Sequence, residues 1–382
     1  MTRAIGDYNW VNEDTRLSEL NLNWKERDLP ERIRTKHVHR LHPYLGKYVP
    51  QLVEILLRKF APKVVFDPFC GSGTTLVEAN TLNIASIGCD ISAFNCLMTK
   101  VKTDRYDTIE LEREIKDILS RTFAETRFTD APEKLVRKET SSYLKQWFNR
   151  KALGELLVFR SMIQDYHYQD VLKIILSRSA RSARLTTHFD LDFPKRPQIA
   201  KYYCFKHRRT CRPTSDAFEF IRRYGLDTIR RIQEFSRIRT GAPTDVICED
   251  SRRIRIPKID AVMTSPPYVG LIDYHEQHRY AYELLDLPDN REHEIGPASR
   301  GTSKLARQRY IEEIGSVFKN IRPSLNDDGI AIIVVHDKSD LYSGLAEETG
   351  FRVDSTLVRN VNRRTGRRSS EFFEQILIWK AA

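Results

Sequence analysis

One stretch constrains the fold of this chain more than any other: residues 64–79, VVFDPFCGSGTTLVEA. Its first three residues are apolar, as in a buried strand, and a helical pattern starts at Thr74. Between them, Gly71 and Gly73 allow a tight turn where the backbone approaches a ligand. Strand, turn and helix in this order indicate an α/β fold, in which ligands bind at the carboxyl ends of the strands. A single Gly-x-Gly also occurs in turns that bind nothing, so this stretch alone leaves both interpretations open.

A second stretch, TSPPY at residues 264–268, follows an apolar strand pattern at residues 259–263. Consecutive prolines fix the backbone, remove two N–H donors and leave carbonyl oxygens as acceptors. A rigid corner that is rich in acceptors and ends in Tyr268 suits a flat base carrying an amino group. By itself, however, the motif more often marks an ordinary turn after a strand.

Together, the motifs DPFCGSGTT and TSPPY resemble those of the S-adenosylmethionine-dependent amino methyltransferases of DNA. The resemblance extends from about His42 to the C-terminus and excludes a middle insertion. Ser265, the first residue of SPPY, is similar to the cytosine-N4 branch, because adenine-N6 enzymes usually carry Asp or Asn there. The order of the motifs departs from many cytosine-N4 enzymes, in which the catalytic motif comes first.

The resemblance implies a Rossmann-like α/β methyltransferase with a mostly parallel sheet, a C-terminal antiparallel hairpin and a helical, basic insertion. The implied activity is site-specific DNA methylation at the exocyclic N4 of cytosine, by direct transfer from S-adenosyl-L-methionine to a flipped base. We expect an N-terminal arm at residues 1–36 and the methyltransferase domain at residues 37–103 and 241–382. Residues 104–240 would form the insertion that recognises the DNA target. DNA is the expected partner, and a cognate restriction endonuclease acting on the same site is a second one.

The implied catalytic residues are Ser265, Pro266, Pro267 and Tyr268. The Ser265 hydroxyl and the Pro266 carbonyl would accept hydrogen bonds from the amino group, which frees the nitrogen lone pair to attack the methyl. Tyr268 would stack on the base. Methylation at carbon 5 needs a cysteine nucleophile next to proline, and the prolines here precede tyrosine instead.

The expected cofactor site combines a lead-in segment, the glycine turn and the ends of two later strands. Asp90 lies about twenty residues beyond the turn, where an acid binds a ribose diol; capping of the next helix is the alternative. The turn lacks a third glycine and a Gly-Lys-Ser/Thr motif, which argues against a dinucleotide or a nucleoside triphosphate. By resemblance, Asp250 binds the adenine amino group, and the full set is Tyr44, Lys47, Pro50, Asp67, Pro68, Phe69, Gly71, Gly73, Thr74, Thr75, Asp90, Ile91, Asp250 and Ser251.

The insertion interrupts the strand–helix alternation with helical segments at residues 110–119, 141–147, 153–162 and 168–176. A stretch in which Arg, Lys and His alternate with Phe and Tyr follows at residues 177–218. Such side chains hold phosphates and stack on bases, although a solvated basic loop has the same composition. The predicted DNA contacts are Arg181, Arg184, Lys195, Arg196, Lys206, Arg208 and Arg209, with Arg363, Arg364 and Arg367 in the turn of the C-terminal hairpin.

Charge and composition limit the kind of partner and the cellular location that we expect for this chain. The 382 residues include 63 Lys and Arg against 52 Asp and Glu, and the formal charge of +11 favours a polyanionic partner. We expect a cytoplasmic protein without a membrane partner, because no apolar run reaches about eighteen residues and no secretory signal is present. The six cysteines are scattered and are expected to be reduced.

Cys204, His207 and Cys211 have the pattern C-x-x-H-x-x-x-C, whose side chains are all possible metal ligands. Structural zinc takes four ligands, normally in two close pairs, and no fourth ligand lies beside these three in the sequence. The sequence therefore predicts no metal site.

Three other functions stay open at this point. An adenine-N6 enzyme would share the chemistry, and a tRNA guanine amino methyltransferase can carry a similar glycine turn. The tRNA enzymes generally have a separate N-terminal RNA-binding domain, for which residues 1–36 leave little room. A third alternative is an inactive nucleic-acid-binding protein that keeps the cofactor fold, but the intact Asp67, Asp90, Asp250 and SPPY argue against it.

Overall fold

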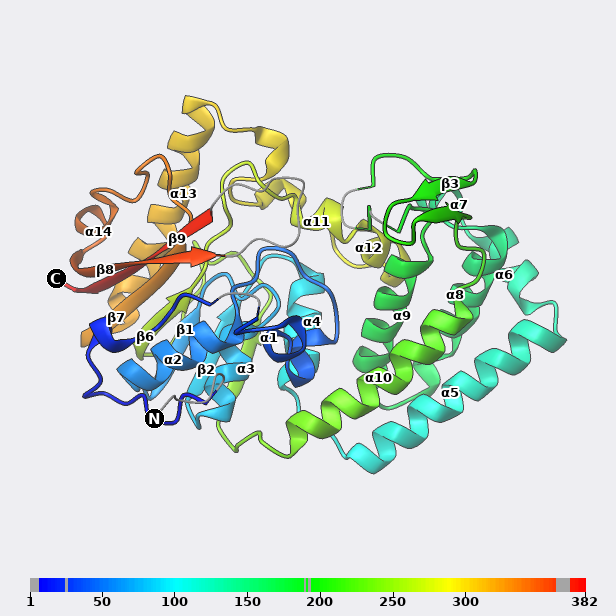
Figure 1. The fold of residues 1–382 in the computed structure, drawn as a ribbon, viewed down its shortest axis with the longest axis horizontal. Coiled ribbons are helices and arrows are strands. Elements are labelled where there is room, and N and C mark those ends of the chain that lie inside the picture. The colour runs from blue at the N-terminus through cyan, green and yellow to red at the C-terminus, as the bar shows by residue number, and fades with distance from the viewer. Residues whose placement is uncertain (1–6, 25–26, 189, 192–193, 362–371) are drawn as a thin grey trace.

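The computed structural model describes residues 7–24, 27–188, 190–191, 194–361 and 372–382. These residues form a seven-stranded sheet flanked by helices, with a second, largely helical body beside it (Figure 1). The strand order is β5-β2-β1-β6-β7-β9-β8. The strands are β1 (Val64–Asp67), β2 (Ala85–Cys89), β5 (Thr244–Ile247), β6 (Ile259–Thr264), β7 (Leu325–Val335), β8 (Phe351–Val361) and β9 (Phe372–Ala381).

The strand directions confirm the predicted fold class. Strands β5, β2, β1, β6 and β7 are parallel, whereas β9 runs antiparallel to both β7 and β8. The antiparallel pair β8–β9 is the expected C-terminal hairpin. Pairing of β1 with β6 is central to the site, because Phe66 lies opposite Val262 and the carboxyl ends of both strands meet at one edge of the sheet.

Side chains along each strand point alternately to the two faces of the sheet, and helices cover both faces. Val65 points to the face covered by α2 (Pro50–Phe60) and α3 (Thr74–Thr81), and Phe66 points to the opposite face, covered by α13 (Lys304–Ile321). Strands buried on both faces need nearly continuous apolar sequence, as in the IDAVMT of β6. The N-terminal segment adds Tyr8, Val11 and Leu22 to the core beside α2.

The insertion forms the second body, on the right in Figure 1. Its helices are α5 (Thr108–Phe128), α6 (Ala131–Lys138), α7 (Ser142–Trp147), α8 (Arg150–Met162), α9 (Gln169–Ala183) and α10 (Phe218–Ser236). A small hairpin of β3 (Tyr202–Cys204) and β4 (Arg209–Cys211) lies between α9 and α10 in the sequence. The hydrophobic core of this body is continuous with α4 (Ala93–Thr103) and α12 (Arg279–Leu285), so the two bodies pack directly against each other.

Short elements complete the described chain. They are α1 (Glu31–Arg34), α11 (Tyr274–Gln277) and α14 (Leu345–Glu348), with 3-10 turns at Leu17–Glu19, His37–Arg40, Ile163–Asp165, Arg291–His293, Ala298–Arg300 and Arg322–Ser324. Within the described ranges, no helix has both the length and the apolar character needed to span a membrane.

Candidate active site

The turn between β1 and α3 requires glycine at two positions. Gly71 and Gly73 have φ values of +50° and +75°, a region that residues with a side chain adopt infrequently. A Cβ atom on Gly71 would lie 2.9 Å from the Tyr44 hydroxyl, and one on Gly73 would lie 2.7 Å from Thr99 Cγ2. The turn therefore combines a left-handed backbone with close packing that leaves no room for a side chain.

Asp90 follows β2 and holds the glycine turn from the side. Its carboxylate accepts hydrogen bonds from Gly71 N at 2.9 Å, Ser92 N at 2.8 Å and Asn95 Nδ2 at 3.1 Å. Burial raises the pKa of Asp90, and these three hydrogen bonds partly offset that effect. A carboxylate has about four acceptor sites, so one stays available to a ligand.

Asp67, at the end of β1, connects the two motifs that the sequence separates by nearly two hundred residues. Its oxygens accept hydrogen bonds from the hydroxyls of Thr264 and Thr75, both at 2.6 Å, and from Tyr48 at 3.3 Å. Burial raises the pKa of Asp67 to about 6, although the hydrogen bonds favour the ionised form. Thr264 directly precedes Ser265, so this network ties the glycine turn to the SPPY corner.

A cavity of about 810 Å³, including its open mouth, lies where these motifs meet. Gly71 and Asp90 line it, and so do Ser265 and Pro267. The two distant motifs therefore share a single cavity, as the interpretation of the sequence requires.

The predicted cofactor and catalytic residues divide into two groups. Those that line the cavity are Tyr44, Lys47, Pro68, Phe69, Gly71, Thr74, Asp90, Ile91, Asp250, Ser251, Ser265 and Pro267. The others are not lining residues: Pro50 starts α2, Gly73 caps α3, Asp67 and Thr75 form the buried network, and Pro266 is buried. Tyr268 is half-buried and donates a hydrogen bond to Glu374 on β9 at 3.3 Å.

Several lining residues were missed by the sequence analysis, among them Tyr48, Asn95, His275 and Glu294. Tyr48 lies in the same lead-in segment as Tyr44, so an aromatic residue four positions later was a usable signal. His275 and Glu294 lie nineteen residues apart in the loop region after SPPY, and their buried side chains form a hydrogen bond through His275 Nδ1. The Glu294 carboxylate also accepts a hydrogen bond from His275 N at 2.8 Å. No local sequence pattern predicts a contact between residues this far apart.

Asp250 has a competing partner inside the protein. Arg252 donates to both of its oxygens, through Nε at 2.8 Å and Nη2 at 2.6 Å. Partial burial opposes ionisation of Asp250, but the hydrogen bonds and charge of Arg252 outweigh it and lower the pKa. The predicted role in binding adenine must therefore share the carboxylate with this arginine.

Two lysines support the site, Lys102 in a buried position and Lys47 in a half-buried one. Lys102 donates to the carbonyl of Ser72 at 2.6 Å, and burial lowers its pKa well below the ordinary value. Lys47 lines the cavity and donates to the carbonyl of His39 at 3.1 Å, and burial lowers its pKa to about 8. Both ammonium groups hold backbone carbonyls and so brace the segments around the cavity.

Comparison with known proteins identifies the family. Residues 28–101 match the model of the N6_N4_Mtase DNA methylases. The chain is 37% identical to the Type II methyltransferase M.MjaII of Methanocaldococcus jannaschii, over 91% of this chain and 81% of that protein. The chain belongs to the DNA amino methyltransferases. It is also 23% identical to the Type II methyltransferase M.MvaI of Kocuria varians, over 77% of this chain and 64% of that protein.

Among solved structures, TrmN from Thermus thermophilus aligns with 92% of this methyltransferase and 53% of its own chain, at 10% identity and a TM-score of 0.36.

S-adenosylmethionine is the cofactor of this methyltransferase, and the cavity fits it chemically. The free acceptor site of Asp90 matches a ribose hydroxyl, and the apolar faces of Phe69, Ile91 and Pro267 match an adenine ring. Tyr44 and Tyr274 also line the cavity and add aromatic surface to it. The glycine turn does not resemble a phosphate site, and this cofactor carries no phosphate.

The predicted DNA contacts differ in exposure. Lys195, Arg196, Lys206, Arg208 and Arg209 are exposed, and Arg181 is half-buried. Arg184 does not agree with the prediction, because it is buried, donates to the carbonyl of Leu191 at 2.6 Å and lies 4.5 Å above the Tyr280 ring. The side chain of Arg184 therefore serves internal packing. Arg363, Arg364 and Arg367 lie outside the described residues.

Proposed function

We propose that this DNA methyltransferase modifies the exocyclic N4 of cytosine. The observation that carries the proposal is that Ser265 lies in the wall of the same cavity as Gly71 and Asp90. The methyl donor and the acceptor corner are then adjacent. Serine before the two prolines also favours the cytosine-N4 branch.

The proposed chemistry depends on the geometry of the amino nitrogen. In cytosine its lone pair is delocalised into the ring, so the nitrogen is a poor nucleophile. The Ser265 hydroxyl and the Pro266 carbonyl accept hydrogen bonds from the two amino hydrogens and favour a tetrahedral nitrogen, whose lone pair is free. S-adenosylmethionine supplies an electrophilic methyl group when bound. The rigid prolines hold the acceptors in place before the reaction, which lowers the entropic cost of alignment.

Tyr268 would stack on the base in this scheme. Its hydroxyl is bonded to Glu374, and Glu374 in turn accepts from Arg359 Nε at 2.7 Å, so the ring is held by the C-terminal hairpin. A base within a duplex cannot reach such a corner, and the target cytosine is therefore flipped out of the helix or taken from a single strand.

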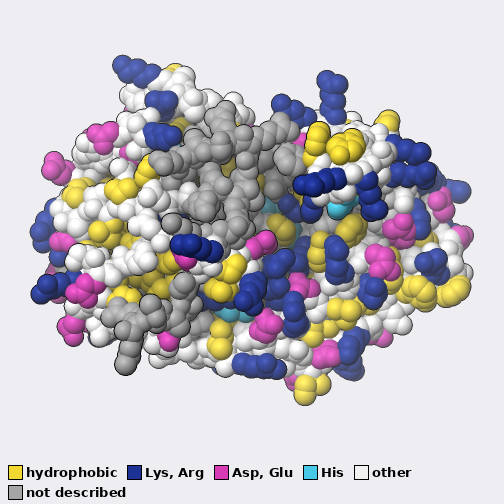
Figure 2. All heavy atoms as spheres, in the orientation of Figure 1, with side chains coloured by type: hydrophobic (Ala, Val, Ile, Leu, Met, Phe, Trp, Pro, Cys, Tyr) yellow, Lys and Arg dark blue, Asp and Glu magenta, His cyan; other side chains and the backbone are white. Residues whose placement is uncertain are grey.

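We assign target recognition to the insertion at residues 104–240. Its exposed cations surround the β3–β4 hairpin, where Figure 2 shows Lys and Arg side chains next to hydrophobic ones. Tyr203 and Phe205 of this hairpin are 56% and 79% exposed. Exposed aromatic rings between cations suit a surface that grips phosphates and stacks on bases. We also propose that a cognate restriction endonuclease acts on the same DNA site.

The decisive experiment incubates the protein with labelled S-adenosylmethionine and either mixed-sequence DNA or tRNA, followed by nucleoside analysis. We expect labelled N4-methylcytosine from DNA. N6-methyladenine alone would refute the choice of base, and label only in tRNA would refute the choice of polymer. Ser265→Ala is expected to lose the label, whereas Ser316→Ala, on the exposed side of α13, should retain it. Cofactor binding without methyl transfer to either polymer would favour the inactive-protein alternative.

A further inference from the structure

The β3–β4 hairpin has almost no hydrophobic core of its own. In each of its two strands the cysteine is the only buried residue, Cys204 in β3 and Cys211 in β4. The neighbouring Tyr203 and Phe205 point their rings into solvent. A hairpin of three-residue strands is not stable without further support, and small units with little core commonly depend on a metal or a disulfide.

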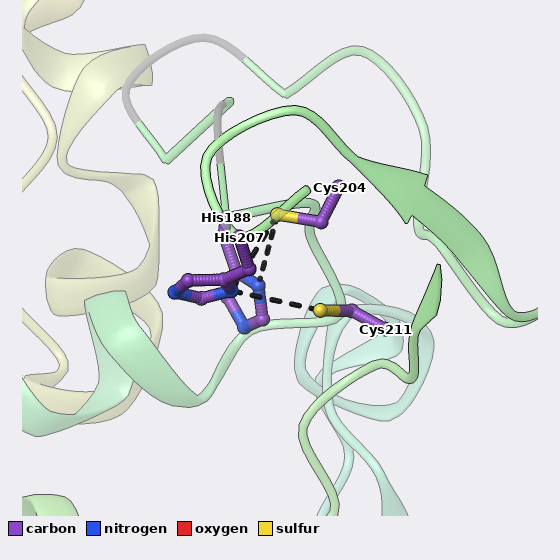
Figure 3. Close-up of side chains that lie close together, drawn as sticks. All are labelled: His188, Cys204, His207 and Cys211. Carbon is purple, nitrogen blue, oxygen red and sulfur yellow. Dashed lines mark hydrogen bonds between the residues drawn. The ribbon is translucent and has the colours of Figure 1, made fainter. Parts of the chain in front are cut away.

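Four side chains with metal-binding atoms converge under this hairpin. His188, Cys204, His207 and Cys211 point toward one another (Figure 3), and their ligand atoms all lie within 4.8 Å of each other. The sequence analysis found three of these residues and predicted no metal because a fourth ligand was missing. His188 lies sixteen residues before Cys204, in the loop after α9, and only the fold brings it to the cluster.

The distances within the cluster match a tetrahedral site. Cys204 Sγ is 3.5 Å from His188 Nδ1 and 3.6 Å from His207 Nδ1, and Cys211 Sγ is 3.6 Å from His207 Nδ1. Zinc with Zn–S bonds near 2.3 Å and Zn–N bonds near 2.1 Å separates tetrahedral sulfur and nitrogen ligands by about 3.6 Å. All three measured contacts therefore agree with ligands that share one ion.

Hydrogen bonding alone explains the geometry of the cluster less well than a shared metal ion does. The Nδ1 atom of His207 lies at the same distance from two sulfur atoms, although an unprotonated imidazole nitrogen accepts one hydrogen bond. The turn between the strands is also constrained: His207 N donates to the carbonyl of Cys204 at 3.2 Å, and Arg208 has a φ of +51°. A left-handed arginine is uncommon, and residues of this kind occur mainly in turns. A metal bound to the preceding histidine would hold the turn in this conformation.

We propose that His188, Cys204, His207 and Cys211 form a structural zinc site. Two thiolates and two neutral imidazoles in a tetrahedral arrangement are a ligand set that zinc prefers, and two thiolates neutralise its charge. The site is structural rather than catalytic because protein side chains supply all four ligands and none of them lines the cofactor cavity. The ion joins the loop after α9 to both strands of the hairpin and to the turn between them, and it fixes the exposed cations of this region relative to the helical body.

The test begins with the metal content of the full-length protein, purified under reducing conditions without a histidine tag. We expect one zinc per chain by mass spectrometry, and cobalt replacement should give the visible spectrum of a tetrahedral, thiolate-bound ion. Cys204→Ser and Cys211→Ser should each lose the bound zinc. Cys248→Ser is the matched control, because Cys248 is exposed and outside the cluster, and it should keep one zinc.

His188→Ala tests the residue that only the fold reveals, and it should weaken zinc binding at least tenfold in a chelator competition. Binding of S-adenosylmethionine should be unchanged in all four variants, which separates this proposal from the proposed function. Wild-type protein that neither contains zinc nor takes it up when reduced would overturn the site. A Cys204–Cys211 disulfide in freshly purified protein, or unchanged zinc affinity in His188→Ala, would also overturn it.

Discussion

The hydrogen bond between Thr264 and Asp67 offers a direct test of how the two motifs are joined. Thr264 is fully buried and its hydroxyl donates to Asp67 Oδ1 at 2.6 Å. Valine has nearly the same shape as threonine, so Thr264→Val removes this bond with little change in packing. A hydrogen bond to a charged group contributes about 1.5–3 kcal/mol. We expect Thr264→Val to lower the free energy of unfolding by about that amount.

Urea unfolding followed by circular dichroism measures this loss. Thr356→Val is the matched control, because Thr356 is also in a strand but is exposed, and it should change stability by less than about 0.5 kcal/mol. A double-mutant cycle with Asp67→Leu isolates the bond itself, because leucine has no acceptor for the Thr264 hydroxyl. The double variant should be more stable than the sum of the single changes predicts, by about 1–2 kcal/mol. Equal losses in Thr264→Val and Thr356→Val, or strict additivity in the cycle, would refute the reasoning.

The raised pKa of the Asp67 carboxyl group predicts that the free energy of unfolding depends on pH. The folded pKa of Asp67, about 6, is raised above the ordinary value of 3.8. Between these two values the folded chain keeps the proton that the unfolded chain has lost, so the contribution to stability is full below about 3.8 and lost as the pH rises to about 6. The difference corresponds to about 3 kcal/mol. The stability of Asp67→Asn should lack this decline when both proteins are titrated over the same range.

The remaining predictions concern the cofactor, the catalytic corner and DNA. Ser265→Ala should lower kcat at least tenfold with little change in the Kd for S-adenosylmethionine, whereas Asp90→Ala should mainly raise that Kd; equal effects on both constants would contradict this division. Gly71→Ala should abolish measurable cofactor binding, because its Cβ would collide with the Tyr44 hydroxyl, and calorimetry that finds a normal Kd would show that the turn tolerates a side chain. Lys206→Ala should reduce the slope of log K for duplex DNA against log salt by about 0.9, whereas the buried Arg184→Ala should lower stability and leave the slope unchanged; a flat salt response of the wild type would remove the basic surface from the DNA interface.

Local sequence was sufficient for the fold class and for most of the predicted residues that line the cavity. The strand, glycine turn and helix at residues 64–79 are contiguous, and their residue types directly indicate the backbone conformation of each part. The same holds for Asp90 after β2 and for the proline corner after β6, because in parallel strands a polar residue just past the apolar run necessarily reaches the ligand-binding edge.

Contacts between distant segments were decided only by the tertiary structure. Pairing of β1 with β6 brings Gly71 and Ser265 to one cavity, and the buried Asp67 holds the two motifs together. Arg184 is buried and makes internal contacts, although its sequence context predicted an exposed position. Folding of the insertion also places His188 next to the two cysteines. Sequence patterns report the preferences of neighbouring residues, whereas burial and long-range contacts depend on how the whole chain packs.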